Sequence, residues 1–212
     1  MARWEPNARE RLSKAALELF QERGFDETAV ADIAERAGLT ERTFFRYFAD
    51  KREVLFGGSS ELHDLLIGSI ATAPATAGPL ETVAVALQAS AAMFEERRKF
   101  AKVRQAVISA HPALRERELI KLVSLAEAMA EALQRRGVAE PAAALAAEAG
   151  MSVFKLAFAR WTEDDEQPLS RHLREAMEQL KSLTAGSGGP SRSGRGRRAA
   201  PRRRPAARSR ER

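Results

Sequence analysis

The chain has no cysteine among its 212 residues, which excludes disulfides, thiolate metal sites and cysteine nucleophiles. Histidine is almost as scarce, and His63, His111 and His172 stand apart from one another without clustered carboxylates. We therefore expect no metal site and no cofactor. The carboxylate run at 162–167 lacks the glycine-punctuated spacing of a calcium loop and is more typical of a solvated turn.

Long apolar runs are also missing. The opening residues, MARWEPNARERL, lack the apolar segment of a secretory signal, and no run approaches the roughly 18 apolar residues of a membrane span. We expect a soluble, cytoplasmic protein with no membrane partner. No nucleophile–base arrangement and no glycine-rich phosphate loop is present, so we expect no enzymatic activity.

Acidic residues become rare only at the end of the chain. Residues 186–212 hold ten arginines and one glutamate, and no apolar residue larger than alanine or proline. Such a segment cannot offset the entropy lost on ordering, so we predict a disordered basic tail. The remaining chain has 25 basic and 28 acidic residues, and the pI of 10.1 therefore describes the tail. The tail either adds non-specific affinity for DNA or is an inert, solubilising extension.

Apolar residues recur with helical spacing over the rest of the chain, and the alternation of a strand is nowhere sustained. We predict an all-α protein of about nine helices. Gly24 and Gly38 are expected to end the first two helices, because glycine tolerates a left-handed turn. Thr28 is the expected N-cap of the second helix, and Thr40 that of the third.

Local patterns also predict where later helices begin. Asp50 and Glu53 form a D-x-x-E pattern that resembles a capping box and predicts the start of a fourth helix. Pro141 and Pro168 suit the first turns of the two final helices, where a missing amide hydrogen costs nothing.

The segment GLTERTFFRYFADK, residues 38–51, places four of the chain's 13 aromatic residues within five positions. At 100° per residue one helical arc holds Arg42, Thr43, Arg46 and Tyr47, and the other holds Phe44, Phe45 and Phe48. We predict that the phenylalanines anchor a short helix while the guanidinium and hydroxyl groups face outward. The alternative is an ordinary amphipathic helix with a solvated basic face.

The residues before this helix favour the first interpretation. Ala34 is small where two helices must cross closely, and Gly38 permits a left-handed turn four residues later. This spacing over 30–48 is typical of a helix-turn-helix unit, whose second helix enters the major groove of DNA. Guanidinium groups suit guanine edges or phosphates, and hydroxyls suit phosphate oxygens. The candidate DNA contacts are Thr40, Arg42, Thr43, Arg46, Tyr47 and Lys51.

The stretch from about Arg9 to Leu55 resembles the N-terminal domain of TetR-family transcriptional regulators, through AALELFQERGFDETAVADIAERAGLTERTFFRYFADKREVL. The resemblance implies a homodimer with a three-helix DNA-binding head and a larger effector-binding and dimerisation domain. We assign residues 9–69 to the first, 70–185 to the second and 186–212 to the tail. Such proteins usually repress promoters and release DNA when a small molecule binds. An activator, or a broad DNA-binding protein assisted by the tail, is the alternative.

By position, Thr28 resembles the family's phosphate-contacting residue before the second helix, and Lys51 matches its usual phosphate-contacting lysine. Phe45 is also a candidate DNA contact by position, but it departs from the pattern, because the family commonly has a tyrosine there whose hydroxyl reaches phosphate. Either one phosphate contact is absent, or Tyr47 takes over that role.

The resemblance also implies that residues from about 57 to 137 enclose an effector pocket. The candidate lining residues are Met93, Phe94, Phe100, Arg104 and Ile108. The alternative is that they are ordinary core residues. Arg104 is the most informative candidate, since a buried arginine needs an acidic partner or a ligand anion.

The segment at 141–161 is alanine-rich and apolar on nearly every side, which is typical of a helix buried on several faces. Together with 168–183 it suits a four-helix bundle across a two-fold axis, as the resemblance implies for a homodimer. The alternative is the central helix of a monomer.

Overall fold

Residues 8–185, the part of the chain that the computed structural model describes, contain nine α-helices, one 3₁₀ helix and no strand. This confirms the all-α prediction, while the predicted basic tail lies outside the described residues. The elements are α1 (Ala8–Arg23), α2 (Val30–Arg36), α3 (Glu41–Tyr47), η1 (Glu53–Phe56), α4 (Ser59–Thr72), α5 (Pro79–Glu96), α6 (Arg98–Ala110), α7 (Pro112–Arg135), α8 (Glu140–Glu163) and α9 (Leu169–Thr184).

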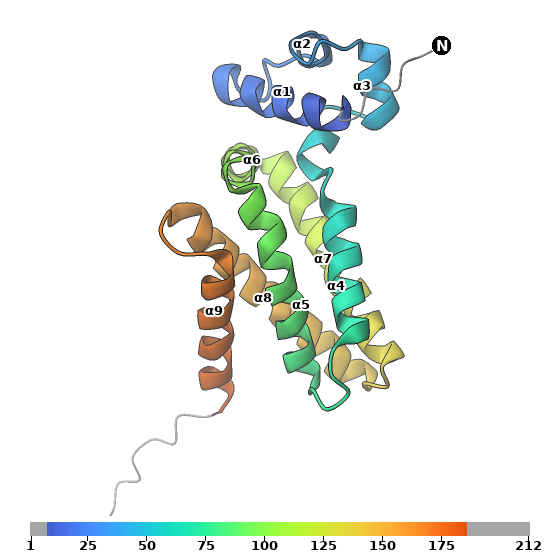
Figure 1. Ribbon diagram of the computed structural model, residues 1–212, viewed down its shortest axis with the longest axis vertical. Helices are drawn as coiled ribbons and strands as arrows, with labels where there is room; N and C mark the ends of the chain where they lie inside the picture. Colours follow the sequence, from blue (N-terminus) through green and yellow to red (C-terminus); the bar gives the residue numbers. More distant parts are fainter. Residues whose placement is uncertain (1–7, 186–212) are drawn as a thin grey trace, which may run out of the picture.

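Helices α1, α2 and α3 form a small head at one end of the molecule, at the top of Figure 1. The turn between α2 and α3 passes through Gly38 at φ +65°, as predicted, and the Leu39 amide donates to the Ala34 carbonyl at 2.8 Å. Thr40 caps α3, because its hydroxyl accepts from the Thr43 amide at 3.2 Å. The helix-turn-helix geometry therefore follows from a glycine turn and a threonine cap.

The loop between α1 and α2 differs from the prediction. The N-cap of α2 is Ala29, whose amide donates to the Asp32 carboxylate at 3.0 Å, so Thr28 was the wrong choice. The Thr28 side chain is buried, and its hydroxyl donates to the Gly24 carbonyl at 2.8 Å. Thr28 therefore closes the end of α1 instead of opening α2.

The predicted fourth helix begins later than expected. The Asp50 carboxylate accepts from the Glu53 amide at 3.1 Å, as a cap does, but only the short η1 follows. The glycine pair at 57–58 separates η1 from α4, which starts at Ser59, because glycine is a poor helix former. The Glu53 carboxylate turns away from the cap and pairs with Arg117 on α7.

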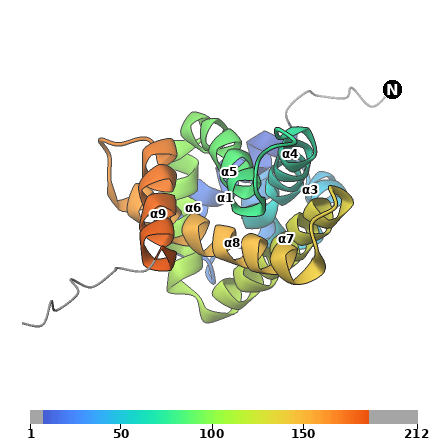
Figure 2. The same cartoon turned by 90° about the horizontal axis from the view of Figure 1, so that it is seen from below.

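The body lies below the head and is organised around α8, which packs against α5, α7 and α9. Seen from below, α8 runs across the molecule between α9 and α7 (Figure 2). Gly150 lets α8 approach α5 closely, since a β-carbon there would overlap the Val83 side chain. Pro141 lies in the first turn of α8, as predicted, whereas Pro168 is the N-cap of α9 and not a first-turn residue.

Within residues 8–185, α8 is the one helix that is long and apolar enough to cross a membrane, by length and composition alone. The expectation that no such segment exists is therefore corrected. Half of its most apolar window is buried inside the fold, where Phe154, Phe158 and Trp161 are covered. A buried core helix meets the same criteria as a membrane span.

Helix α6 lies between head and body and is seen nearly end-on below α1 in Figure 1. Its residues Val107 and Ile108 belong to the apolar core of the head, together with Leu114 from α7. Ala101, two turns earlier on α6, belongs to the core of the body. Because one helix contributes to both cores, the head and the body meet through packed side chains.

Candidate nucleic-acid interface and effector cavity

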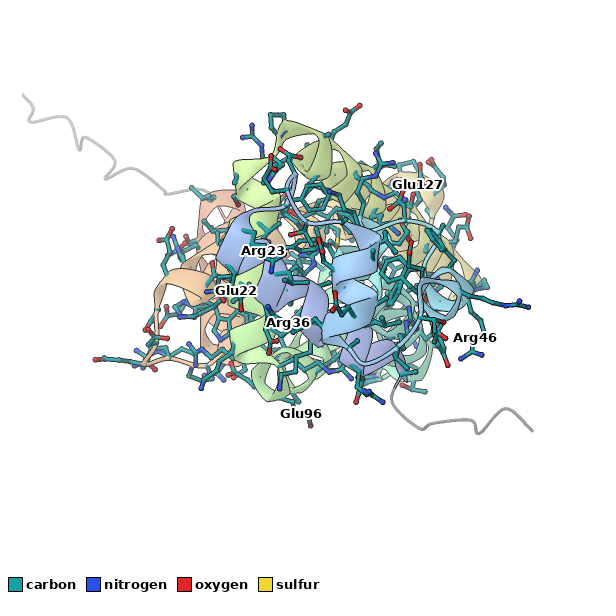
Figure 3. The ribbon with its side chains drawn as sticks, turned by 90° about the horizontal axis from the view of Figure 1, so that it is seen from above. Glu22, Arg23, Arg36, Arg46, Glu96 and Glu127 are labelled. Atoms are coloured by element: carbon teal, nitrogen blue, oxygen red, sulfur yellow. The ribbon has the colours of Figure 1, made fainter. Side chains whose placement is uncertain are left out.

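The outward face of α3 carries the side chains predicted to contact DNA. Arg42 and Arg46 are exposed, as is Thr40, and Thr43 is half-buried with its hydroxyl oxygen 3.0 Å from that of Thr40. Viewed from above, Arg46 projects away from the rest of the molecule (Figure 3). Arg42 makes no hydrogen bond or ion pair with any residue between 8 and 185. Its guanidinium donors are therefore available to an incoming partner.

The prediction that all three phenylalanines anchor α3 is wrong for one of them. Phe44 and Phe48 are buried, but Phe45 is 55% exposed. Tyr47 packs partly against the head core, although the helical arc placed it with the outward groups. Phe45 and Tyr47 lie at nearly equal angles on either side of the direction that Phe44 and Phe48 define, so helix periodicity alone does not separate them.

Lys51 was expected to offer its ammonium group to a phosphate, and the structure uses that group elsewhere. The Nζ atom donates to the carbonyls of Phe25, Asp26 and Thr28 at 2.8, 3.1 and 2.9 Å. It also lies 4.7 Å from the centroid of the Phe25 ring. An ammonium has three hydrogens, and all three are occupied. Lys51 thus holds the loop between α1 and α2.

Thr28, the other expected phosphate contact outside α3, does not present its side chain to solvent. Only 1% of the residue is exposed, and its hydroxyl is bonded within the same loop. Thr28 and Lys51 therefore stabilise one loop together, because Lys51 also bonds to the Thr28 carbonyl. Of the eight predicted DNA contacts, Thr40, Arg42, Phe45 and Arg46 are exposed, Thr43 and Tyr47 are half-buried, and Thr28 and Lys51 use their polar groups within the loop.

An exposed ion pair links α2 to α1. Arg36 donates to both carboxylate oxygens of Glu22, at 3.0 and 2.8 Å, and lies 3.7 Å from Glu18. The hydrogen bond from Arg36 lowers the pKa of Glu22, and the same bond raises the pKa of Arg36. In Figure 3 the two labelled side chains approach each other between the two helices. The pair is exposed, so it adds only modestly to the apolar packing that holds α2 on α1.

The body contains a cavity of about 790 Å³. Its wall comes from η1, α4, α5, α6, α7 and α8, and four of the five predicted pocket residues line it: Met93, Phe94, Phe100 and Arg104. Ile108 does not. It is fully buried among the apolar side chains of the head, one turn of α6 beyond Arg104. The volume is within the range of small-molecule sites.

Arg104 has the acidic partner that its burial requires. Its Nη1 donates to the Glu118 carboxylate at 2.8 Å, and its Nε donates to the Leu55 carbonyl of η1. Burial lowers the pKa of Arg104, and the opposite charge of Glu118 counteracts this effect. Arg104 thus joins the cavity wall to the segment that leaves the head.

Several residues at this junction were missed by sequence reasoning. The Phe56 ring lies within 5.3–5.8 Å of the cationic groups of Arg104, Arg117 and Lys121. A signal for the Arg104–Glu118 pair was present, because each lies seven residues from His111, where α6 turns into α7. Nothing local in the sequence indicated that Glu53 would reach Arg117 across 64 residues.

A short helix that exposes guanidinium and hydroxyl groups after a glycine turn, joined to a helical body with a cavity, is typical of a helix-turn-helix DNA-binding regulator. The family models agree with this class. The model for bacterial regulatory proteins of the tetR family matches residues 12–56, and the MftR C-terminal domain matches residues 77–185. The chain belongs to the TetR family of transcriptional regulators.

Two curated relatives match the N-terminal part of the chain. The regulator TcmR of Streptomyces glaucescens is 37% identical over 81 residues, which are 38% of this chain and 36% of TcmR. The mycofactocin biosynthesis regulator MftR of Mycobacterium tuberculosis is 45% identical over 49 residues, or 23% of this chain and 25% of MftR. The matches thus span about a third and a quarter of these relatives' own lengths.

Solved structures share the fold along most of the chain. A TetR-family regulator from Syntrophomonas wolfei has a TM-score of 0.64 at 18% identity, covering 85% of this chain and 96% of its own. FadR from Thermus thermophilus, solved with lauroyl-CoA, has a TM-score of 0.55 at 24% identity and covers 88% and 100%. FadR from Bacillus subtilis, solved with stearoyl-CoA, has a TM-score of 0.57 at 18% identity and covers 81% and 96%.

Proposed function

We propose that this protein is a homodimeric repressor that binds a palindromic operator and releases it when a small molecule occupies the body cavity. One observation carries the proposal. Arg104 lines the cavity, and its guanidinium donates to the Leu55 carbonyl in the segment that follows the head. A ligand that contacts this side chain acts on a residue already bonded to the head, which gives occupancy a physical route to the DNA-binding surface.

We assign DNA binding to residues 9–69 and effector binding and dimerisation to residues 70–185. Arg42 and Arg46 donate to guanine edges or phosphates, and the hydroxyls of Thr40, Thr43 and Tyr47 donate to phosphate oxygens. The exposed ring of Phe45 suits a thymine methyl group, which is an apolar contact open to a side chain without a hydroxyl.

The proposed dimer uses α8 and α9. Leu145 is 72% exposed on α8, Leu156 is also exposed there, and Leu183 is exposed near the end of α9. Large apolar side chains exposed on two neighbouring helices are typical of an interface between copies. A two-fold dimer places two heads on successive major grooves, which is why we propose a palindromic operator.

A second candidate is an activator or a broad DNA-binding protein of the same fold, favoured by the ten arginines in residues 186–212. A footprint separates the two, since a discrete palindrome supports the first and diffuse protection the second. Deletion of residues 186–212 should lower affinity for random DNA at low salt if the tail binds phosphates. In either case we propose a cytoplasmic, nucleoid-associated regulator and not an enzyme.

The test of the proposed function is selection of bound sequences from random DNA by the full chain. Enrichment of one inverted repeat supports the proposal, and absence of any enriched sequence contradicts it. The selected duplex then serves to screen for effectors by release. Lauroyl-CoA and stearoyl-CoA, the ligands of two proteins with this fold, are the first molecules to test.

A further inference from the structure

A second, smaller cavity of about 240 Å³ lies where the head meets the body. It is lined by Arg9 from α1 and Tyr47 from α3 on the head side, and by Arg117 and Lys121 from α7 on the body side. Its wall is shared with the large cavity through Phe56, Ser59, Ser60 and Lys121. The two spaces are therefore neighbours.

The smaller cavity has an excess of positive charge. Three cationic side chains line it, those of Arg9, Arg117 and Lys121, and a single carboxylate, that of Glu53, lies among them. Glu53 pairs closely with Arg117 and lies 4.0 Å from the Lys121 Nζ. Arg9 donates one hydrogen to the Gly57 carbonyl at 2.9 Å. One carboxylate therefore faces three cations.

The N-terminus of α4 adds hydrogen-bond donors to this cavity. Helix α4 begins at the same wall, with Ser59 and Ser60, and no side chain caps its N-terminus. The first amides of a 14-residue helix and its dipole both favour an anion.

The large cavity differs in charge. There Arg104 pairs with Glu118 at 2.8 Å, and Arg97 pairs with Glu61 at 3.2 Å. Its wall is partly aromatic, since it includes Phe94 and Phe158, whose rings pack edge to face. The arginines of this space are already matched by carboxylates. An anionic group of a ligand is therefore favoured in the smaller cavity, and an apolar group in the larger one.

We propose that the junction cavity is the anion subsite of the effector site, so that the effector is an amphipathic anion. Its carboxylate, sulfate or phosphate lies among Arg9, Arg117 and Lys121, and its apolar part fills the large cavity. This inference rests on the proposed function and specifies its ligand. Because Arg9 belongs to the head and Arg117 to the body, a bound anion draws the two together on this side of the molecule.

The test compares two twelve-carbon ligands that differ in charge, dodecyl phosphate and dodecan-1-ol, below their aggregation limits. Each displaces the neutral fluorescent probe N-phenyl-1-naphthylamine from the full-length protein. Charge-assisted hydrogen bonds at the subsite predict tighter binding of the anion. Dodecyl phosphate should therefore displace the probe at a concentration at least about tenfold lower than that needed for dodecan-1-ol. Arg117→Gln should bring the two ligands close to equality, because it removes one of the three cations that face the anion.

Two further variants decide the interpretation. Lys121→Gln keeps the Arg117–Glu53 pair and should also reduce the preference for the anion, which guards against a folding defect in Arg117→Gln. Lys155→Gln is the matched control, because it removes a cation from the wall of the large cavity only, and the preference should persist. Thermal unfolding of each variant confirms that it is folded.

The inference is overturned if wild type shows no preference, if Lys155→Gln alone removes it, or if the probe does not bind. It is also overturned if Arg117→Gln weakens DNA binding without ligand and leaves the preference intact, since the cluster then serves a DNA phosphate. A neutral ligand that releases the operator would contradict the anion subsite while leaving the proposed repressor function in place. Loss of operator selection, by contrast, contradicts the proposed function itself.

Discussion

The two arginines of α3 differ in how free their guanidinium groups are. Arg46 lies over the ring of Tyr47, with its Cζ 4.9 Å from the centroid, and donates to the Tyr47 hydroxyl at 3.2 Å. Arg42 has no such contact within residues 8–185. A guanidinium held on a tyrosine is already oriented and suits a phosphate, whereas a free one can form the bidentate bond that guanine offers. We therefore expect sequence readout from Arg42 and positioning from Arg46.

The first prediction tests this division at the residue scale. Arg42→Ala should weaken binding to the selected operator by about 1–3 kcal/mol and relax the preference at one base pair. Binding to random DNA should change much less. The measurement is fluorescence anisotropy with operator and random duplexes at two salt concentrations. Arg135→Ala, an exposed arginine at the end of α7, is the control for loss of charge. Equal losses on both duplexes would show that Arg42 contacts only the backbone.

The second prediction concerns Lys51, whose ammonium closes the loop between α1 and α2. Lys51→Gln should lower the free energy of unfolding by about 1–3 kcal/mol, because carbonyl groups of a partly buried loop lose their donor. Chemical denaturation measures this change. Lys14→Gln, on the exposed side of α1, should have little effect, since its ion pair is on the surface. If stability stayed at the wild-type value while DNA binding fell, Lys51 would be a phosphate contact after all.

Residue roles were predictable from the sequence where their causes are local. Thr40 caps α3 because a threonine hydroxyl reaches an amide three residues ahead, and Gly38 turns left-handed because only glycine does so readily. The role of Lys51 depends on carbonyls 23 to 26 residues away, and no local rule brings them together. Thr28 was misassigned for a related reason. Its hydroxyl lies between the end of α1 and the start of α2, and it bonds to the Gly24 carbonyl at the end of α1.

At the scale of elements, the existence of a helix was easier to predict than its neighbours. Helix α6 spans 98–110 between a charged turn and Pro112, and its one amphipathic pattern does not reveal that it serves two cores. Ile108 was therefore assigned to the effector pocket, while the structure buries it in the head. Sequence periodicity shows that a face is buried, but it does not show against what.

The third prediction tests the close contact of α5 and α8. Gly150→Ala should destabilise the protein by about 1–3 kcal/mol, because the new methyl group overlaps the Val83 side chain in a packed core. Gly68→Ala is the matched control, since nothing lies near its added β-carbon, and alanine in a helix interior should leave stability equal or raise it. Both changes are measured by thermal unfolding.

A double variant separates overlap from other effects of Gly150→Ala. Adding Val83→Ala removes the overlapping methyl groups, so the combined loss should be smaller than the sum of the two single losses. Simple additivity would mean that the loss in Gly150→Ala does not come from overlap with Val83.

At the scale of the whole molecule, the head and the body are joined by both packing and charge. Val107, Ile108 and Leu114 fill the head core from below, and Arg104 and Arg117 bond to the segment that connects head and body. The family resemblance predicted two functional parts, but residues that join them come from distant positions and carry no motif. Leu66 and Ile70 of α4 lie in the body core, which ties this connecting helix to the effector side.

The last prediction concerns assembly. Leu145→Glu places a charge on the exposed apolar face of α8 and should convert a dimer into a monomer at micromolar concentration, as measured by light scattering after size exclusion. Affinity for the palindrome should fall together with the dimer, because half-sites one helical turn apart, about 34–36 Å, need two linked heads. Ile120→Glu is the control: Ile120 is exposed on α7, outside the proposed interface, and this variant should remain dimeric. A wild-type protein that is monomeric at micromolar concentration would contradict the proposed dimer. Equal affinity for a single half-site and for the full palindrome would contradict the palindromic operator.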